Sequence, residues 1–210
     1  MILNAEQEAI RRLARDFAHA EIAPHVRQWE ASGGPSRDLY RHMGQVGLLG
    51  MTVDPSYGGS GLDFVSYALA IEEIAAVDGG ISNMMAANNS PVAVAIETYG
   101  TSEQRNRFLP RLCTGEWLGS IHLTEPHTGS DAAAISTRAV RDGGEFVIDG
   151  HKALITGGST SDVAMIVART DPEAGKSGIS VFLTPTDNPG YIVLRKERKL
   201  GHRTNDTCQV

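Results

Sequence analysis

Residues 124–131 form a polar, loop-like segment whose side chains are suited to contacting a ligand. The segment reads Thr-Glu-Pro-His-Thr-Gly-Ser-Asp, and we refer to it as the hydroxyl loop. Hydroxyls and backbone N–H groups in such a loop can converge on a diphosphate or a ring nitrogen. A capped surface loop that binds nothing has the same composition, because Pro126 fixes the backbone, Gly129 frees it, and Ser130 or Asp131 can cap the next element. Spacing alone favours the capped surface loop.

Other titratable residues are better explained by structure than by catalysis. Glu72 and Glu73 lie on a predicted amphipathic helix, where paired acids most often form a solvated face. His122 and His127 bracket the hydroxyl loop, but a histidine in a strand or turn is more often a hydrogen-bonded structural residue than a catalyst. The sequence therefore nominates no catalytic residue.

Charge and cysteine content argue against several functional classes. The 210 residues carry a formal net charge of -6 without a run of Lys or Arg, which argues against a nucleic-acid partner. Cys113 and Cys208 are far apart and lack partners at metal-ligand spacing, so neither a disulfide framework nor a metal site is expected. The sequence has no apolar stretch of transmembrane length and no apolar signal segment at its start, so we expect a soluble, cytoplasmic protein without an integral membrane segment.

Residues before about 115 have the periodicity of helices. Asn4 with Gln7, and Thr101 with Gln104, can each form a reciprocal N-cap. The predicted helices cover residues 4–24, 38–46, 63–76, 81–99 and 101–112. The fourth contains Met84 and Met85, which we interpret as core residues in preference to the lining of a ligand pocket.

After Gly115 the apolar pattern alternates and turns recur about every ten residues, which is typical of strands. The predicted strands cover residues 117–123, 136–141, 145–149, 151–156, 163–169, 179–184 and 191–194. Turn sequences such as Asp142-Gly143-Gly144 separate them. Helices followed by strands indicate an α+β protein, with an N-terminal all-helical domain (1–115) and an antiparallel β-barrel or sandwich domain (116–210).

Four motifs, in order and in register, resemble those of the acyl-CoA dehydrogenase family. Residues 57–61 match Y-G-G-x-G, and the hydroxyl loop matches T-E-P-x-x-G-S-D. Residues 150–156 match G-x-K-x-x-I-T, and residues 199–207 are similar to K-x-G-x-R-x-S-x-T. The resemblance covers nearly the whole chain and implies an FAD site without a dinucleotide-binding βαβ unit. It also implies that a C-terminal helical domain is absent from this sequence.

The family pattern implies that two segments contact the cofactor. The implied FAD-contacting residues are Ile121, His122, Leu123, Thr124, Gly129, Ser130, Leu154, Ile155 and Thr156. The Thr124 hydroxyl is expected near flavin N5, and Ser130 near the diphosphate and the CoA-bearing substrate. A donor at N5 is chemically reasonable, because hydride arrival places negative charge on the ring. Ile121 and Leu154 depart from the family by standing where aromatic residues are frequent.

The reaction implied by this resemblance is α,β-dehydrogenation of an acyl-CoA thioester. An electron-transfer flavoprotein is the expected electron acceptor, and a homo-oligomer, a tetramer in full-length form, is the expected assembly. The family takes its catalytic carboxylate from the C-terminal domain, so we nominate no base here and expect the isolated chain to be inactive. An acyl-CoA oxidase or flavin monooxygenase of the same architecture remains an alternative, as does a non-catalytic FAD- or CoA-binding module or subunit.

Overall fold

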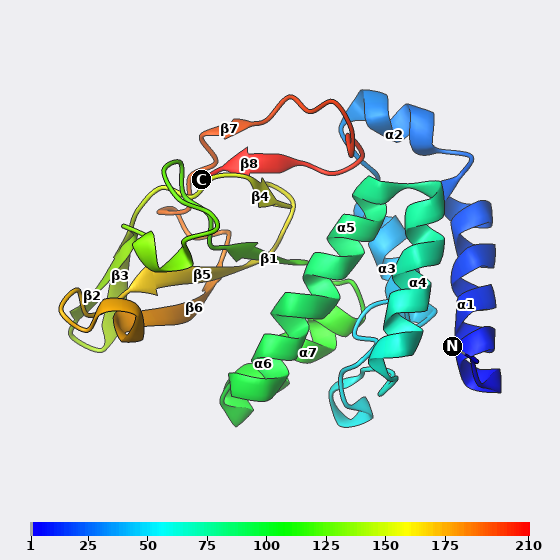
Figure 1. The fold of residues 1–210 in the computed structure, drawn as a ribbon, viewed down its shortest axis with the longest axis horizontal. Coiled ribbons are helices and arrows are strands. Elements are labelled where there is room, and N and C mark those ends of the chain that lie inside the picture. Colours follow the sequence, from blue (N-terminus) through cyan, green and yellow to red (C-terminus); the bar gives the residue numbers. More distant parts are fainter. Residues whose placement is uncertain (1) are drawn as a thin grey trace. The chain divides into compact units, whose positions relative to one another are not determined.

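The structure, a computed structural model, describes residues 2–210 and separates into two compact units. The first unit runs to Leu118 and also includes Arg198–Asp206, while the second comprises Gly119–Glu197 and Thr207–Val210. Helices in the first and strands in the second confirm the predicted α+β class (Figure 1). The contiguous domain boundary expected after residue 115 stays a prediction. Among the described residues, every helix is too short or too polar to span a bilayer.

Helices and short helical turns make up most of the first unit. Its α-helices are α1 (Ala5–Phe17), α2 (Val26–Ser32), α3 (Arg37–Gln45), α4 (Phe64–Val77), α5 (Gly79–Ala87), α6 (Val94–Tyr99) and α7 (Ser102–Cys113). Single turns of π-helix (Ala18–Ile22 and Asn88–Ala93) and 3-10 helix (Pro55–Tyr57) lie between them. Helix α4 packs against both α1 and α5 (Figure 1). Met84 and Met85 are fully buried in the shared hydrophobic core, which supports their interpretation as core residues.

Both predicted N-caps are present. The Asn4 side chain accepts from Gln7 N at 2.8 Å, and the Gln7 side chain accepts from Asn4 N at 3.1 Å. Thr101 and Gln104 make the same exchange at the start of α7. Each pair satisfies two N–H groups that a helix start would otherwise leave without partners.

The prediction of one continuous helix over residues 81–99 is wrong. Ser90 adopts an extended backbone (φ -143°, ψ 119°) and separates α5 from α6. The residue is followed by Pro91, whose ring disfavours helical geometry in the residue before it. The sequence interpretation also missed α2, a short helix that ends at Gly33 in the left-handed region (φ 90°).

Glu73 joins α1 to α4 and corrects the expectation of a solvated acidic face. Its carboxylate accepts from Arg11 Nε at 2.7 Å and from Arg15 Nε at 2.8 Å, and the residue is only 7% exposed. The hydrogen bond from Arg15 is the main cause that lowers the pKa of Glu73 to about 2. Glu72, its neighbour, is exposed as expected.

The segment Arg198–Asp206, which we call the strap, belongs to the helical unit. Its Thr204 hydroxyl donates to Asp78 Oδ1, and the same oxygen caps α5 by accepting from Ile81 N at 2.7 Å. Gly80 leaves room for this contact, because a Cβ there would lie 2.1 Å from Thr204 Oγ1. The strap is therefore fixed to the start of α5.

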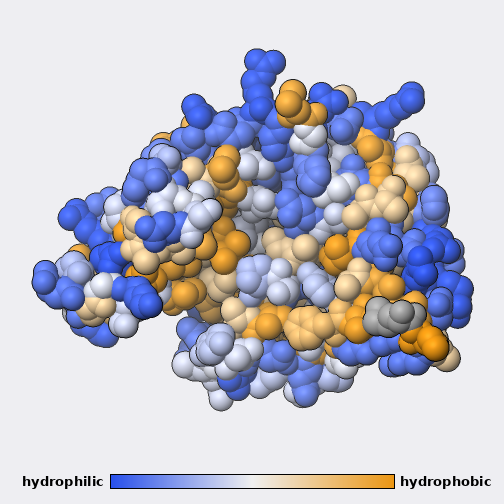
Figure 2. Space-filling view, in the orientation of Figure 1, coloured by the Kyte–Doolittle hydropathy of each residue, from blue (hydrophilic) through white to orange (hydrophobic). Residues whose placement is uncertain are grey.

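Two small sheets form the second unit. Its strands are β1 (Gly119–His122), β2 (Arg138–Asp142), β3 (Glu145–Asp149), β4 (Ile155–Thr156), β5 (Val163–Arg169), β6 (Ile179–Pro185), β7 (Arg195–Lys196) and β8 (Thr207–Gln209), with 3-10 turns at Ala132–Ala134 and Gly175–Gly178. One sheet has the order β1-β5-β2-β3, with β6 also paired to β5, and the other has the order β4-β8-β7. Figure 2 shows hydrophobic residues among the hydrophilic ones over the part of this unit that holds the larger sheet.

The larger sheet is mixed, so the prediction of a purely antiparallel domain is wrong. β2–β3 and β5–β6 are antiparallel, whereas β1 and β2 both pair with β5 in parallel. The turn sequences identify hairpins but carry no information on pairing between strands that are distant in sequence. The strand predicted over residues 191–194 is also wrong, and β8 was missed.

Because Glu73 is buried and Glu72 is exposed, the two neighbours should respond differently to the same change. We expect Glu73→Ala to lower the free energy of unfolding of the helical unit by about 2 kcal/mol, since it leaves two arginines without their acceptor. Glu72→Ala should change it by less than about 0.5 kcal/mol. Denaturation followed by the fluorescence of Trp29 and Trp117, both in this unit, measures the difference. Equal midpoints for the two variants would contradict this assignment.

Candidate functional site

The hydroxyl loop is closed on itself by short hydrogen bonds. Glu125 and Thr128 exchange backbone hydrogen bonds of 2.9 and 3.1 Å, and the Thr128 hydroxyl donates to Asp131 O at 2.6 Å. Gly129 folds back over Thr124, because a Cβ at Gly129 would lie 3.7 Å from Thr124 Cγ2. The turn residues therefore bring Gly129 of the T-E-P-x-x-G-S-D motif back to the threonine at its start.

The second segment with candidate site residues runs over residues 150–156, and we call it the Leu154 segment. Its Ala153 N donates to Thr124 O at 2.8 Å, so it lies directly against the hydroxyl loop. Ile155 is buried and pairs with Cys208 of β8, and Thr156 pairs with Thr207. The structure thus brings together two segments separated by about thirty residues of sequence.

Leu154 has an unusual backbone for a leucine. Its φ is 58°, in the left-handed region, and its side chain is 63% exposed. A non-glycine residue in this region costs roughly 1 to 2 kcal/mol, and a large exposed apolar side chain gains no burial in return. The surrounding structure therefore holds Leu154 in a conformation that a leucine rarely adopts.

The candidate residues at the end of β1 and just after it, residues 121–123, alternate in burial. Ile121 and Leu123 are partly exposed, whereas His122 is buried, as expected from the alternation of side chains along a strand. The His122 side chain lines a pocket that is open to solvent, and Ile121 and Leu123 do not line it. The structure therefore separates His122 from its two neighbours.

Thr124 and Ser130 present hydroxyls that are free for a ligand. Among residues 2–210, neither side-chain oxygen has a hydrogen-bond partner. Ser130 is exposed near the end of the hydroxyl loop, and Thr124 is partly buried beside the Leu154 segment. Two hydroxyls at either end of one closed loop are suited to binding separate polar groups of the same ligand.

A buried ion pair connects the two segments at their base. Lys152 Nζ lies 2.9 Å from Glu125 Oε1, with the two side chains 5% and 1% exposed. Burial alone would raise the pKa of Glu125, but hydrogen bonds from Ser136, Thr137 and Lys152 outweigh it and hold that pKa well below its ordinary range. Burial lowers the pKa of Lys152, and Glu125 opposes the shift. The lowered pKa keeps the Glu125 carboxylate charged at neutral pH.

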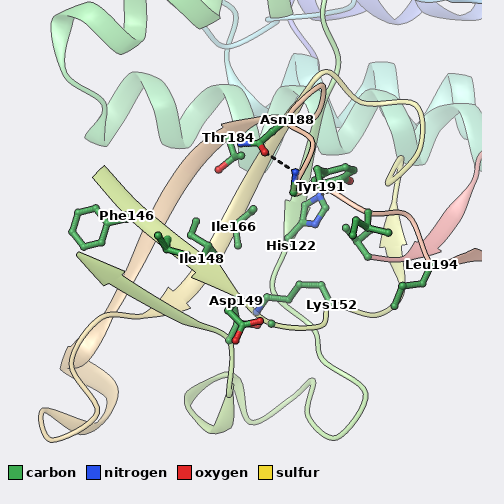
Figure 3. Close-up of a pocket in the computed structure, with 16 residues that line it drawn as sticks. His122, Phe146, Ile148, Asp149, Lys152, Ile166, Thr184, Asn188, Tyr191 and Leu194 are labelled. Carbon is green, nitrogen blue, oxygen red and sulfur yellow. Dashed lines mark hydrogen bonds between the residues drawn. The ribbon is translucent and has the colours of Figure 1, made fainter. Parts of the chain in front are cut away.

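A pocket of about 550 Å³, open to solvent, lies in the second unit (Figure 3). Figure 3 shows Ile148 and Ile166 among its apolar lining, with His122 beside Tyr191. The Tyr191 hydroxyl donates to Gly158 O at 2.6 Å, and His122 Nε2 lies 2.9 Å from Ser120 Oγ. These polar groups are engaged within the unit, which agrees with a structural histidine.

Burial, with a smaller contribution from the charge of Lys152, lowers the pKa of His122 to about 4. The imidazole is therefore neutral at physiological pH. A neutral histidine that is 1% exposed and already bonded to a serine cannot exchange protons with solvent readily.

Two family models match the chain in succession. The model described as "Acyl-CoA dehydrogenase, N-terminal domain" matches residues 4–116, and "Acyl-CoA dehydrogenase, middle domain" matches residues 120–210. This chain belongs to the acyl-CoA dehydrogenase family. The family identified from four sequence motifs is confirmed.

Individual members of the acyl-CoA dehydrogenase family are similar to this chain over nearly its whole length. An acyl-CoA dehydrogenase of Bacillus subtilis is 38% identical over 210 residues, which is 100% of this chain and 55% of that protein. Glutaryl-CoA dehydrogenase from Mycobacterium smegmatis in complex with FADH2 has a TM-score of 0.91 and 37% identity, covering 99% of this chain and 52% of the other. A chain from the electron transferring flavoprotein structure of Acidaminococcus fermentans has a TM-score of 0.95 and 36% identity, covering 100% and 55%. The chain spans about half the length of these relatives.

Sequence reasoning missed the Glu125–Lys152 pair, although both residues lie in motifs that it quoted. Glu125 is the second residue of the T-E-P motif, and Lys152 is the lysine of the G-x-K motif. The available signal was that Glu125 and Lys152 carry opposite charges and that each lies next to residues that become buried. Pairing across about thirty residues of sequence requires the fold, because spacing does not reveal which segments meet.

The low pKa of His122 should make stability fall in mildly acidic solution. The unfolded state takes up a proton near pH 6.5, while the folded state remains neutral down to about pH 4. The contribution of His122 to the free energy of unfolding is therefore fully present above pH 6.5. This contribution is lost as pH falls from 6.5 toward 4, by up to about 1.4 kcal/mol per pH unit. We expect His122→Gln to flatten this slope between pH 6.5 and 5, as measured by urea denaturation followed by circular dichroism.

His19→Gln is the matched control for His122→Gln, because His19 is exposed on the helical unit and loses little hydration on folding. It should keep the slope of the unchanged chain. Parallel pH profiles for the unchanged chain and His122→Gln would show that His122 does not carry the effect.

Proposed function

We propose that this chain forms the FAD-contacting part of an acyl-CoA dehydrogenase. The observation that carries the proposal is the meeting of the hydroxyl loop and the Leu154 segment through the Ala153 N–Thr124 O bond. That contact gathers the free hydroxyl of Thr124 and the exposed, left-handed Leu154 in one unit. Members of the family similar to this chain include one in complex with FADH2.

The residues present are suited to a flavin in chemical type. Leu154 offers an apolar surface to an aromatic ring, and Thr124 offers a hydroxyl donor. Ser130 and the loop backbone offer donors to a diphosphate. We propose Ile121, Leu123, Thr124, Gly129, Ser130, Leu154, Ile155 and Thr156 as the contacting residues. His122, which the sequence also indicates, lines the pocket with its side chain, so we propose that it contacts FAD through its backbone.

The proposed reaction is α,β-dehydrogenation of an acyl-CoA thioester. When bound, FAD supplies the hydride acceptor for this oxidation. The Thr124 hydroxyl would hold a donor where negative charge develops, and a preorganised donor of this kind lowers the barrier. Leu154 would exclude water from one face of the ring, and Ser130 would hold a phosphate or the CoA-bearing substrate.

The carboxylates of the two segments do not suit the role of catalytic base. Glu125 is buried and bonded to Lys152, Ser136 and Thr137, which stabilise its charged form and weaken it as a base. Asp131 is exposed at the end of the hydroxyl loop, where solvent surrounds its carboxylate. We therefore nominate no base among the described residues and propose that this chain alone does not oxidise an acyl-CoA.

The proposal extends to the partners of the reaction. We propose an acyl-CoA thioester as substrate, an electron-transfer flavoprotein as electron acceptor, and a homo-oligomeric enzyme. The similarity to a chain from the Acidaminococcus fermentans electron transferring flavoprotein structure supports the choice of acceptor. The similarity to acyl-CoA and glutaryl-CoA dehydrogenases supports the choice of substrate class.

FAD titration of the 210-residue chain tests the proposal, followed by anaerobic addition of acyl-CoA thioesters of several chain lengths. We expect saturable quenching of flavin fluorescence, because the two segments offer both apolar and polar contacts. We expect no bleaching of the visible absorbance, because the chain provides no suitable base. Bleaching would overturn the statement about the base, and absence of any FAD binding would count against the proposed site.

Leu154→Gly should affect FAD binding, measured in the same titration, differently from stability, measured by denaturation. Glycine adopts the left-handed backbone without strain, so the free energy of unfolding should stay equal or rise by up to about 1 kcal/mol while FAD binding weakens. Ile192→Gly is the control, because Ile192 is 60% exposed in the same unit but is not in the left-handed region. It should lose about 0.5 to 1 kcal/mol of stability and retain FAD binding.

In an enzyme that combines this chain with a catalytic base, Thr124→Ala should slow flavin reduction on the order of 100-fold. The effect on substrate affinity should be much smaller, because the hydrogen bond matters most as charge develops on the ring. Stopped-flow reduction at several acyl-CoA concentrations separates the two quantities. Thr124→Ser keeps the hydroxyl and should restore most of the rate, whereas an unchanged rate in Thr124→Ala would remove this residue from the mechanism.

A further inference from the structure

The Glu125–Lys152 pair is the centre of a hydrogen-bond network in the second unit. Lys152 Nζ donates to Glu125 Oε1 at 2.9 Å and to Leu123 O at 3.0 Å. Glu125 Oε2 accepts from Ser136 N at 2.7 Å and from Ser136 Oγ at 2.6 Å, and Oε1 also accepts from Thr137 N at 2.9 Å. Both charged groups thus have hydrogen-bond partners within the unit.

The network joins three parts of the chain that are separate in sequence. Leu123 and Glu125 flank Thr124 at the start of the hydroxyl loop, and Lys152 lies two residues before Leu154. Ser136 and Thr137 precede β2. The pair therefore lies one residue from the proposed hydroxyl donor and two residues from the proposed ring-covering side chain.

Stability alone does not account for such a pair. Removing two charges from water costs several kcal/mol per ion, and well-packed apolar replacements of buried pairs are often equally or more stable. What an ion pair provides is a defined distance and direction between the atoms that it joins. Most of the hydroxyl loop beyond Glu125 is exposed, including Pro126, His127 and Ser130, so its position depends on contacts at its base.

We infer that Glu125 and Lys152 are positioning residues, whose ion pair sets the hydroxyl loop and the Leu154 segment at the spacing needed to hold one flavin between Thr124 and Leu154. The adjacent bond from Ala153 N to Thr124 O reports this spacing directly. The inference rests on the proposed function, because the spacing has a ligand only if FAD binds there.

Three variants separate positioning from stability. Glu125→Gln and Lys152→Met each leave one buried charge without its partner, and both should unfold more easily than the unchanged chain. The double variant Glu125→Gln/Lys152→Met leaves no unpaired charge at this site, so it should regain much of that loss. It still lacks the ion pair, so a positioning role predicts that it does not regain the geometry of the site.

The decisive measurements are made at a temperature where circular dichroism shows every variant to be folded. We expect hydrogen exchange at the Ala153 amide to be faster by about tenfold or more in the double variant, and FAD affinity to fall by about tenfold to 100-fold. Arg138→Gln/Asp149→Asn is the matched control, because it removes an ion pair of the same 2.9 Å length whose side chains are 68% and 69% exposed. The control should change neither quantity.

A double variant that keeps both the Ala153 protection and the FAD affinity of the unchanged chain would overturn the inference and show a purely structural pair. If the unchanged chain binds no FAD, the proposed function fails instead. Hydrogen exchange at Ala153 then decides by itself whether the pair sets the spacing of the two segments.

Discussion

Buried polar side chains determine how the segments of this chain meet, because each needs partners where water is excluded. Glu73 joins two helices through two arginines, and Asn89 bonds with backbone groups of Leu48, Met51 and Met85, which belong to two separate segments of the helical unit. In the second unit, Glu125 and Lys152 do the same for two loops and the approach to a strand. Apolar burial supplies most of the stabilisation, but it is non-directional. The directional bonds select one arrangement of the segments.

Much of the fold can be predicted from local signals in the sequence. The reciprocal caps at Asn4 and Thr101 were predictable because their hydrogen bonds involve residues only three apart. The parallel pairing of β1 with β5 was not predictable, because it joins Gly119 to Val163, which are far apart in sequence. The break at Ser90 is intermediate, since Pro91 signals it but helical periodicity on both sides conceals it.

The candidate site was predicted in its parts and not in its arrangement. Motifs placed Thr124 and Leu154 on two segments, and the fold brings those segments into contact. The sequence did not show that His122 turns away from its neighbours, although strand alternation contains that information once the strand is known. It also gave no sign of the left-handed backbone at Leu154, because such a conformation in a leucine is imposed by surrounding structure.

The strap makes both units discontinuous in sequence. Because Arg198–Asp206 belongs to the helical unit while β7 and β8 on either side belong to the other, the polypeptide passes between the units three times. Neither unit is a single stretch that recombination could transplant as a cassette. A graft of residues 119–210 would carry Thr204 away from Asp78 and leave the start of α5 without its contact. Descendants of this architecture are expected to inherit the two units together, and to diversify by substitution within them instead of by exchange.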